Sequence, residues 1–187
     1  MSEIKENLEI VRERIRAACR RAGRDESEVT LIAVSKTKPV PMLMEAYEAG
    51  AREFGENKVQ EILAKHSNLP GDTRWHMIGH LQRNKVHQVL EKAALIHSVD
   101  SLRLAEQIEA EAAKKGLEAQ ILLEINVSKE ESKYGFFMEE AEEAIRHISQ
   151  FSHVHIRGLM TIAPFVENPE ENRTIFKKLY QFAVDIG

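Results

Sequence analysis

The chain has 187 residues, of which 43% are hydrophobic, which is enough for one ordinary core and close to the usual length of a single domain. Its 26 Lys and Arg residues against 30 Asp and Glu give a net charge of −4, so no strong basic field would attract nucleic acid or an anionic membrane. No apolar run is long enough to span a bilayer, and the charged, amphipathic N-terminus is unlike a signal peptide, so we expect a cytoplasmic protein.

An apolar stripe at helical spacing runs through the first 22 residues. It includes Ile4, Leu8, Val11 and Ile15, and the single cysteine, Cys19, lies beside it. One cysteine excludes an internal disulfide and any multi-cysteine metal site. We expect Cys19 to be a buried residue of this helix rather than a redox thiol.

Behind this helix, short β-rich runs alternate with helical patterns, which predicts a parallel sheet with crossover helices. The predicted strands are residues 29–34, 52–55, 74–78, 94–99, 119–127 and 154–162. The predicted helices are residues 39–50, 57–65, 81–91, 102–115, 138–150 and one that begins at Pro169. Asp100 or Ser101 is expected to cap the helix at 102–115, Gly116 to end it, and Asn168 to cap the last helix.

Six consecutive βα units fit either a doubly wound open sheet or most of a (β/α)₈ barrel, and periodicity alone does not choose between them. A complete barrel needs eight units and typically about 250 residues, so a barrel here would consist of the first six units and the N-terminal helix. No Gly- or Ser-rich linker divides the units, so we expect a single domain over residues 1–187. In either architecture, ligands bind where the strands end.

Lys36 directly follows the first predicted strand, and strand alternation places it on the same face as Ile32 and Val34. A lysine becomes an imine-forming nucleophile when burial or a neighbouring cation keeps its amine uncharged, and Lys38 could supply that cation. The ordinary alternative is a solvated lysine at a strand end, and the residue alone does not decide between the two.

Other polar residues at strand ends allow more than one role. Asn57 either caps the following helix or faces a ligand. His76 and His80 are four residues apart, but Gly79 lies between them and no acidic or cysteine partner shares their spacing, so we expect no metal site. The histidines of the last strand, at 153 and 155, are expected to be structural.

Several familiar catalytic patterns do not occur in the sequence. It has no G-x-G-x-x-G after a strand, no Walker A loop, no H-E-x-x-H and no G-x-S-x-G. Dinucleotide binding, NTP hydrolysis, zinc proteolysis and serine hydrolysis therefore lack their characteristic residues.

Six ordered segments cover nearly the whole chain. They are AVSKTKP at 33–39, FGENKVQE at 54–61, RWHMIGHLQRNK at 74–85, IHSVDS at 96–101, INVSKEESKYG at 125–135 and RGLMTIAP at 157–164. Together these segments resemble the pyridoxal phosphate homeostasis protein family, whose fold is similar to the N-terminal barrel of alanine racemase. Six blocks in order are a far more specific signal than any single motif.

The resemblance implies that Lys36 holds pyridoxal 5′-phosphate (PLP) as an internal aldimine, and that Asn57, His76 and Met160 line the cofactor site. It also implies a role in cellular vitamin-B6 homeostasis without catalytic turnover, with PLP-dependent apo-enzymes as recipients of the cofactor. We expect a monomer or a weak homodimer.

Two alternatives remain open. A PLP-dependent amino-acid racemase or decarboxylase would need a second acid/base group facing the imine and usually a further domain, and the sequence indicates neither. An interaction module on the same scaffold would leave Lys36 as an ordinary surface amine.

One departure from the family pattern concerns the PLP phosphate. The family holds it with a Ser/Met/Gly-rich loop and an Arg-Ile-Gly-Thr-like segment, and both lie in two further βα units that these 187 residues lack. A barrel without these units has an open edge and lacks its main phosphate anchor. We therefore expect a chain truncated at its C-terminus, with the phosphate-binding residues beyond Gly187.

Overall fold

The strands form one six-stranded parallel sheet in the order β1-β2-β3-β4-β5-β6. The computed structural model describes residues 2–130 and 133–187. The strands are β1 (Ala33–Val34), β2 (Glu53–Glu56), β3 (Arg74–Met77), β4 (Ala93–Val99), β5 (Ala119–Glu124) and β6 (Val154–Met160). A doubly wound sheet would place its first strand in the interior, so this sequential order identifies the first six units of a barrel.

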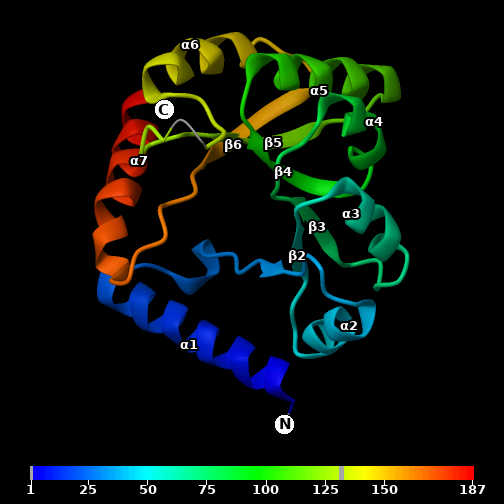
Figure 1. Ribbon diagram of the computed structural model, residues 1–187, viewed down its shortest axis with the longest axis vertical. Coiled ribbons are helices and arrows are strands. Elements are labelled where there is room, and N and C mark those ends of the chain that lie inside the picture. The colour runs from blue at the N-terminus through cyan, green and yellow to red at the C-terminus, as the bar shows by residue number, and fades with distance from the viewer. Residues whose placement is uncertain (1, 131–132) are drawn as a thin grey trace.

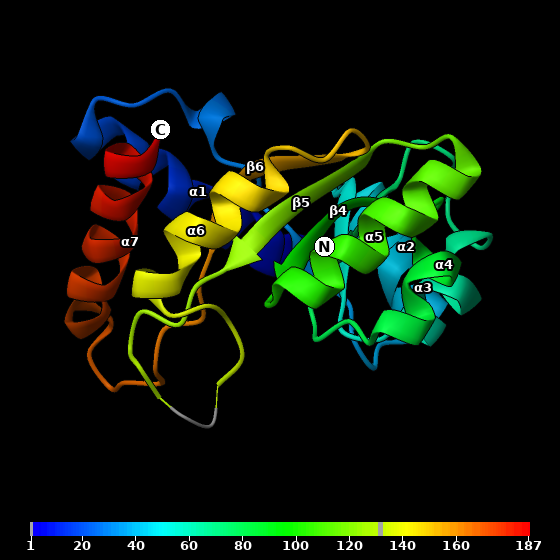
Figure 2. The ribbon, with the colours of Figure 1, turned by 90° about the horizontal axis from the view of Figure 1, so that it is seen from above.

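Helices alternate with the strands and lie on the outside of the curved sheet (Figure 1). They are α1 (Glu3–Ala22), α2 (Val40–Glu48), α3 (Val59–His66), α4 (Val86–Val89), α5 (Leu102–Lys115), α6 (Met138–Ile148) and α7 (Arg173–Ile186). Short 3₁₀ turns are η1 (Glu26–Glu28), η2 (Arg83–Lys85) and η3 (Pro169–Asn172). Figure 2 shows α5 and α6 side by side; α5 contacts β5 and β6, and α6 contacts β6.

The predicted caps of the helix at 102–115 are confirmed. The Ser101 hydroxyl accepts a hydrogen bond from the backbone N–H of Leu104, and Gly116 ends α5 in the left-handed conformation. Asn168 accepts a hydrogen bond from the backbone N–H of Glu170, but it caps the 3₁₀ turn η3 and not α7, which begins at Arg173. Cys19 is buried, as predicted. No helix among the residues that the structure describes is long and apolar enough to cross a membrane.

Alternation along the strands decides which side chains face the helices. Phe54 and Trp75 are register partners on β2 and β3, and Trp75 packs against His66 of α3, so these side chains point outward. Their strand neighbours Gly55 and His76 therefore point inward. Side chains on the outer face of the sheet pack against the helices and form the apolar core. Side chains on the inner face line the centre of the barrel.

Four predicted strands are longer than the observed ones, by one or two residues at 74–78 and 154–162 and by more in the other two. The predicted strand at 29–34 is reduced to two residues because β1 lies at the sheet edge, and its only ladder partners are Phe54 and Gly55. The predicted strand at 119–127 ends at Glu124, because the buried side chain of Asn126 turns the chain by accepting the Glu130 N–H and donating to its carbonyl.

Several helix predictions also differ from the structure. The last helix, predicted from Pro169, begins with the 3₁₀ turn η3, and α7 starts at Arg173. The predicted helix at 81–91 is divided into η2 and the four-residue α4. The predicted helix at 57–65 begins two residues later, with Lys58 at the cap position. Asn57 is therefore not the helix cap, and its side chain is available for another role.

Candidate functional site

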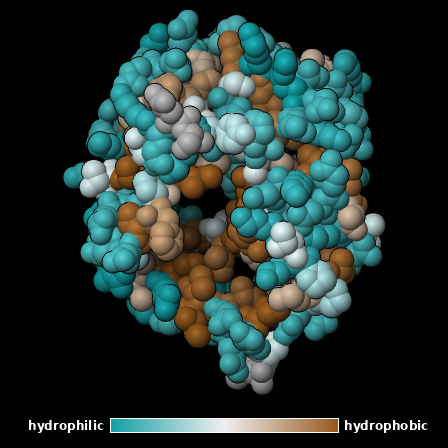
Figure 3. All heavy atoms as spheres, viewed as in Figure 1, coloured by the Kyte–Doolittle hydropathy of each residue, from teal (hydrophilic) through white to brown (hydrophobic). Residues whose placement is uncertain are grey.

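A cavity of about 420 Å³ opens where the strands end, a size typical of small-ligand sites. Every strand, or the loop that follows it, contributes to its wall. The lining residues are Val34, Lys36, Asn57, Ile78, Gly79, His80, His97, Glu124, Tyr134, Met160 and Ile162. Figure 3 shows a hollow at the centre of this face, with hydrophobic residues around it.

Lys36 lies directly after Ser35, at the end of β1, and its side chain lines the cavity. The side chain is exposed, so burial does not shelter the amine. The reason is that β1 is an edge strand, with a neighbouring strand on one side only. Lys38 was expected to supply a neighbouring cation, but it lines a different, mostly apolar cavity between α1, α2 and β1.

Asn57 reaches the cavity because two loops approach closely. A Cβ atom on Gly79 would lie only 2.5 Å from the Asn57 carbonyl oxygen and 2.6 Å from its Cα atom. Only glycine allows the loop after β3 to pass this close to the loop after β2. The contact places Asn57 and His80 on the same wall.

His76 does not line the cavity. It is 4% exposed and lies inside the barrel, with its Nδ1 atom 2.8 Å from His97 Nε2 and its Nε2 atom 2.6 Å from Glu53 Oε2. His76 Nε2 donates to the Glu53 carboxylate, whereas the direction of the bond between His76 Nδ1 and His97 Nε2 depends on which ring carries the proton. His97, and not His76, provides the imidazole of the wall.

Burial, with a smaller contribution from His76, lowers the pKa of His97 to about 4, so its ring is neutral at pH 7. Sequence reasoning did not identify His97, although the segment IHSVDS carries it. The available signal was its place near the end of a β-rich run, where an inward side chain reaches the cavity.

Glu124 was also missed. It ends β5 opposite Met160 of β6, is only 7% exposed, and forms no hydrogen bond through its carboxyl group with any residue that the structure describes. Burial raises its pKa, Asp100 raises it further, and His80 opposes the shift. The sequence signal was a glutamate within the otherwise apolar run AQILLEINV.

An aromatic pair forms the wall beside Glu124. The His80 ring stacks on Tyr134 with 4.1 Å between the ring centroids. His80 Nδ1 lies 2.8 Å from Asp100 Oδ2, which fixes the orientation of the imidazole. The stacked pair joins the loop after β3 to the loop after β5.

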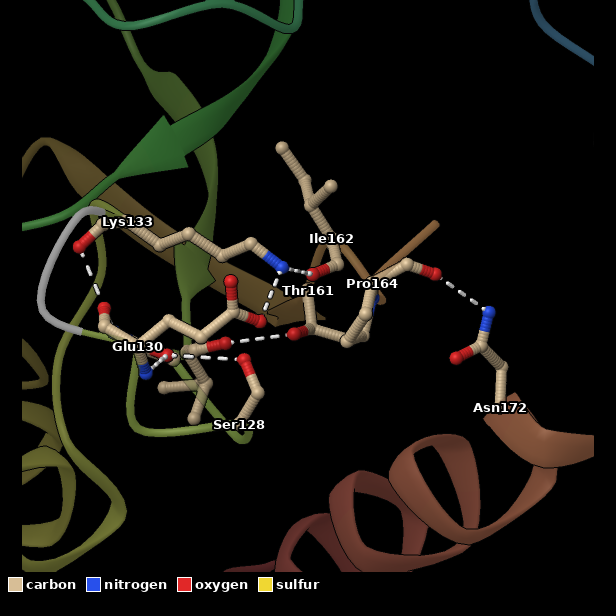
Figure 4. Close-up of polar contacts among 9 residues, drawn as sticks. Ser128, Glu130, Lys133, Thr161, Ile162, Pro164 and Asn172 are labelled. Carbon is tan, nitrogen blue, oxygen red and sulfur yellow. Dashed lines mark hydrogen bonds and ion pairs between the residues drawn. The ribbon is translucent and has the colours of Figure 1, made fainter. Parts of the chain in front are cut away.

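The loops after β5 and β6 are tied together (Figure 4). Lys133 Nζ donates to Glu130 Oε1 at 2.8 Å and to the Ile162 carbonyl at 3.4 Å. The Thr161 hydroxyl donates to the Ile125 carbonyl at 2.8 Å. These bonds hold Ile162 against the cavity.

The remaining polar candidates lie outside the cavity. His153 and His155 contact Glu109 and Glu118, respectively. Among the residues that the structure describes, no three His, Cys, Asp or Glu side chains are grouped so that they could hold a metal ion.

Comparison with known proteins gives a family for this site. The sequence profile described as "Alanine racemase, N-terminal domain" matches residues 5–185. The pyridoxal phosphate homeostasis protein of Aquifex aeolicus is 43% identical over 175 residues, which are 93% of this chain and 77% of the relative. The chain belongs to the pyridoxal phosphate homeostasis protein family. The predicted resemblance is therefore confirmed.

Solved structures agree with this membership. PipY of Synechococcus elongatus PCC7942, determined with PLP bound, is 37% identical with a TM-score of 0.81, over 98% of this chain and 82% of PipY. Alanine racemase of Clostridium difficile 630 has a TM-score of 0.72 at 17% identity, over 84% of this chain and 42% of the racemase. The second likeness shows the fold alone and confirms the predicted alanine racemase-type barrel.

Proposed function

We propose that this chain binds PLP through the amine of Lys36 and acts in cellular vitamin-B6 homeostasis rather than as an enzyme. The observation that carries the proposal is the meeting of Lys36, Asn57 and Met160 in one cavity, in a chain 37% identical to a protein with PLP bound. PLP-dependent apo-enzymes would be the recipients of the cofactor. The proposal that the chain does not catalyse a reaction is supported by the relatives' shared name, pyridoxal phosphate homeostasis protein.

The residues of the cavity fit the chemistry of this cofactor. Val34, Ile78 and Met160 supply apolar surface for an aromatic ring, and Asn57 supplies an amide. When bound, PLP supplies an aldehyde that condenses with a lysine amine with loss of water. Lys36 is the amine at the wall, and the neutral ring of His97 adds no charge beside it.

The decisive experiment locates the attachment point. Purified protein is mixed with PLP, the near-visible absorbance band is recorded, and the complex is reduced with borohydride and mapped by peptide mass spectrometry. We expect the label on Lys36 and loss of the band in Lys36→Ala. Lys38→Ala is the matched control, since Lys38 lines the neighbouring cavity, and it should keep the band. Label on another lysine, such as Lys133, would refute the proposal.

One observation favours the enzyme alternative, a PLP-dependent racemase or decarboxylase. Glu124 is a buried carboxyl group in the same cavity, with a pKa raised by burial, and such a group can carry a proton. We expect the protein with PLP to exchange the α-deuterium of amino acids no faster than free PLP does. Exchange well above that rate, abolished by Glu124→Gln, would instead establish catalysis.

A further inference from the structure

Lys36 lies between two residues that are both held by one buried ion cluster, formed by Glu56, Glu61 and Lys65. Lys65 is the centre of the cluster: its Nζ atom donates to Glu56 Oε1 at 2.8 Å and to Glu61 Oε2 at 2.7 Å. Lys65 is 7% exposed and Glu56 is fully buried. By strand alternation the cluster lies on the outer side of β2, beneath α3, whereas Lys36 faces the cavity.

The residue before Lys36, Ser35, is fixed by several hydrogen bonds. The Ser35 carbonyl accepts from Lys65 Nζ at 2.9 Å and from the Lys38 N–H at 3.0 Å. Its hydroxyl donates to Glu56 Oε1 at 2.7 Å, and its N–H donates to the Gly55 carbonyl at 3.0 Å. Ser35 is thus bound through its backbone and its side chain.

The residue after Lys36 is fixed in an unfavourable conformation. Thr37 has φ of 63°, in the left-handed region that a β-branched residue rarely adopts. Such a residue persists only when its surroundings hold it. The contact that does so is the Thr37 N–H, which donates to Glu61 Oε2 at 2.7 Å.

The charges of the three members respond differently to burial. Burial raises the pKa of Glu56, although the hydrogen bonds from Lys65 and Ser35 oppose the shift. Burial opposes the charge on Lys65, but its hydrogen bonds to Glu56 and Glu61 outweigh burial and raise its pKa, so it remains an ammonium group. The hydrogen bond from Lys65 lowers the pKa of Glu61. A buried ion pair is weak support for stability, because desolvation offsets most of the attraction. The cluster is better explained by what it orients.

We propose that Lys65, together with Glu56 and Glu61, is a positioning group for Lys36: it fixes the backbone on both sides so that the amine is held toward the cavity. The inference rests on the proposed function, in which Lys36 is the attachment point for PLP. A residue whose neighbours are already ordered loses less conformational entropy when its side chain is captured.

The test uses two substitutions of Glu61, whose side chain is partly exposed, so that the variants fold. Glu61→Ala removes the acceptor of the Thr37 N–H, whereas the amide oxygen of Glu61→Gln can still accept it. Glu111→Ala is the matched control: Glu111 pairs with Lys114 on α5 with similar side-chain exposure, 16% against 21%, and lies away from the cavity. Lys65→Met with Glu56→Leu removes both buried charges together, which avoids a lone buried ion.

The first readout is the equilibrium constant for formation of the near-visible band with PLP. We expect Glu61→Ala and the Lys65/Glu56 double variant to weaken it about tenfold, Glu61→Gln to weaken it less, and Glu111→Ala to leave it unchanged. The inference is overturned if Glu61→Ala has the same equilibrium constant as the wild type. It is also overturned if Glu111→Ala weakens the constant as much as Glu61→Ala does while the two variants are equally stable.

The second readout does not require PLP. A small amine-reactive ester labels the free protein, and peptide mass spectrometry gives the rate at Lys36 relative to Lys114, a lysine of α5 away from the cluster. We expect this ratio to change severalfold in Glu61→Ala and to be restored in part by Glu61→Gln. If PLP does not attach to Lys36 in the wild type, the proposed function is refuted. If PLP attaches to Lys36 but neither measurement changes in the Glu61 and Lys65 variants, only the positioning role is refuted.

Discussion

At the scale of single residues, Glu124 is the group with the least favourable surroundings in the cavity. Its carboxyl group is buried without a partner among the described residues, and burial of an unpaired charge is costly. A raised pKa means that the folded chain holds this proton more tightly than the unfolded chain does. The stabilising effect is complete below the ordinary pKa of a glutamate and is lost as the pH rises through the folded pKa.

This loss of stability with rising pH gives a prediction for Glu124→Gln, whose side chain cannot ionise. At pH 8 the variant should be more stable than the wild type, because glutamine stays neutral whereas the Glu124 carboxyl group must ionise in a buried site. The difference should disappear near pH 4. Urea unfolding at both pH values measures it, with Glu106→Gln on the exposed face of α5 as a control that shows no such trend. A wild type that is the more stable protein at pH 8 would contradict the prediction.

At the scale of elements, the cavity depends on loops that follow consecutive strands. The loops after β2 and β3 touch at Gly79 and Asn57, and those after β5 and β6 are joined through Thr161 and Lys133. Strand ends only place these loops near one another. The close contacts decide which side chains reach the ligand.

We expect Gly79→Ala to displace Asn57, because the new methyl group would meet backbone atoms that cannot rotate away. PLP affinity should fall about tenfold, and stability should fall by about 1–3 kcal/mol, as for other overpacked sites. Gly71→Ala is the matched control, since a Cβ atom there meets nothing within 4 Å. Titration of the near-visible band and thermal unfolding report the two effects. Equal behaviour of the two alanine variants would refute the role of this contact.

At the scale of the whole molecule, the sheet has two edges, β1 and β6, and apolar side chains lie exposed around them. The helix α7 has one face packed on the core through Ile175 and Leu179. A second apolar stripe on the same helix, made of Phe176, Tyr180 and Val184, is more than half exposed. Exposed stripes of this kind favour self-association.

We therefore expect this chain to associate weakly as its concentration rises. Replacement of Phe176 and Tyr180 by serine should lower the average mass seen by sedimentation at high concentration, while stability changes by less than about 0.5 kcal/mol. Lys177→Ser, on the same helix, should change neither quantity. An unchanged mass in the double variant would show that the stripe has no part in association.

Local features of the fold were predictable from the sequence. The order of the βα units, the caps at Ser101 and Gly116, and the place of Lys36 after the first strand all depend on residues a few positions apart. Hydrogen bonds within a helix and alternation along a strand act over that range, so they leave a pattern in the sequence. The family resemblance added the cofactor and its lysine as expectations.

Only the tertiary structure decided the rest. Whether the six units form a barrel or an open sheet depends on which strands pair. The choice of His97 over His76 for the wall depends on which side chain of the inward face reaches the cavity. The bonds from Ser35 to Glu56 and from Thr37 to Glu61 join residues 21 and 24 positions apart. Such contacts arise from the packing of whole units, and no local period in the sequence records them.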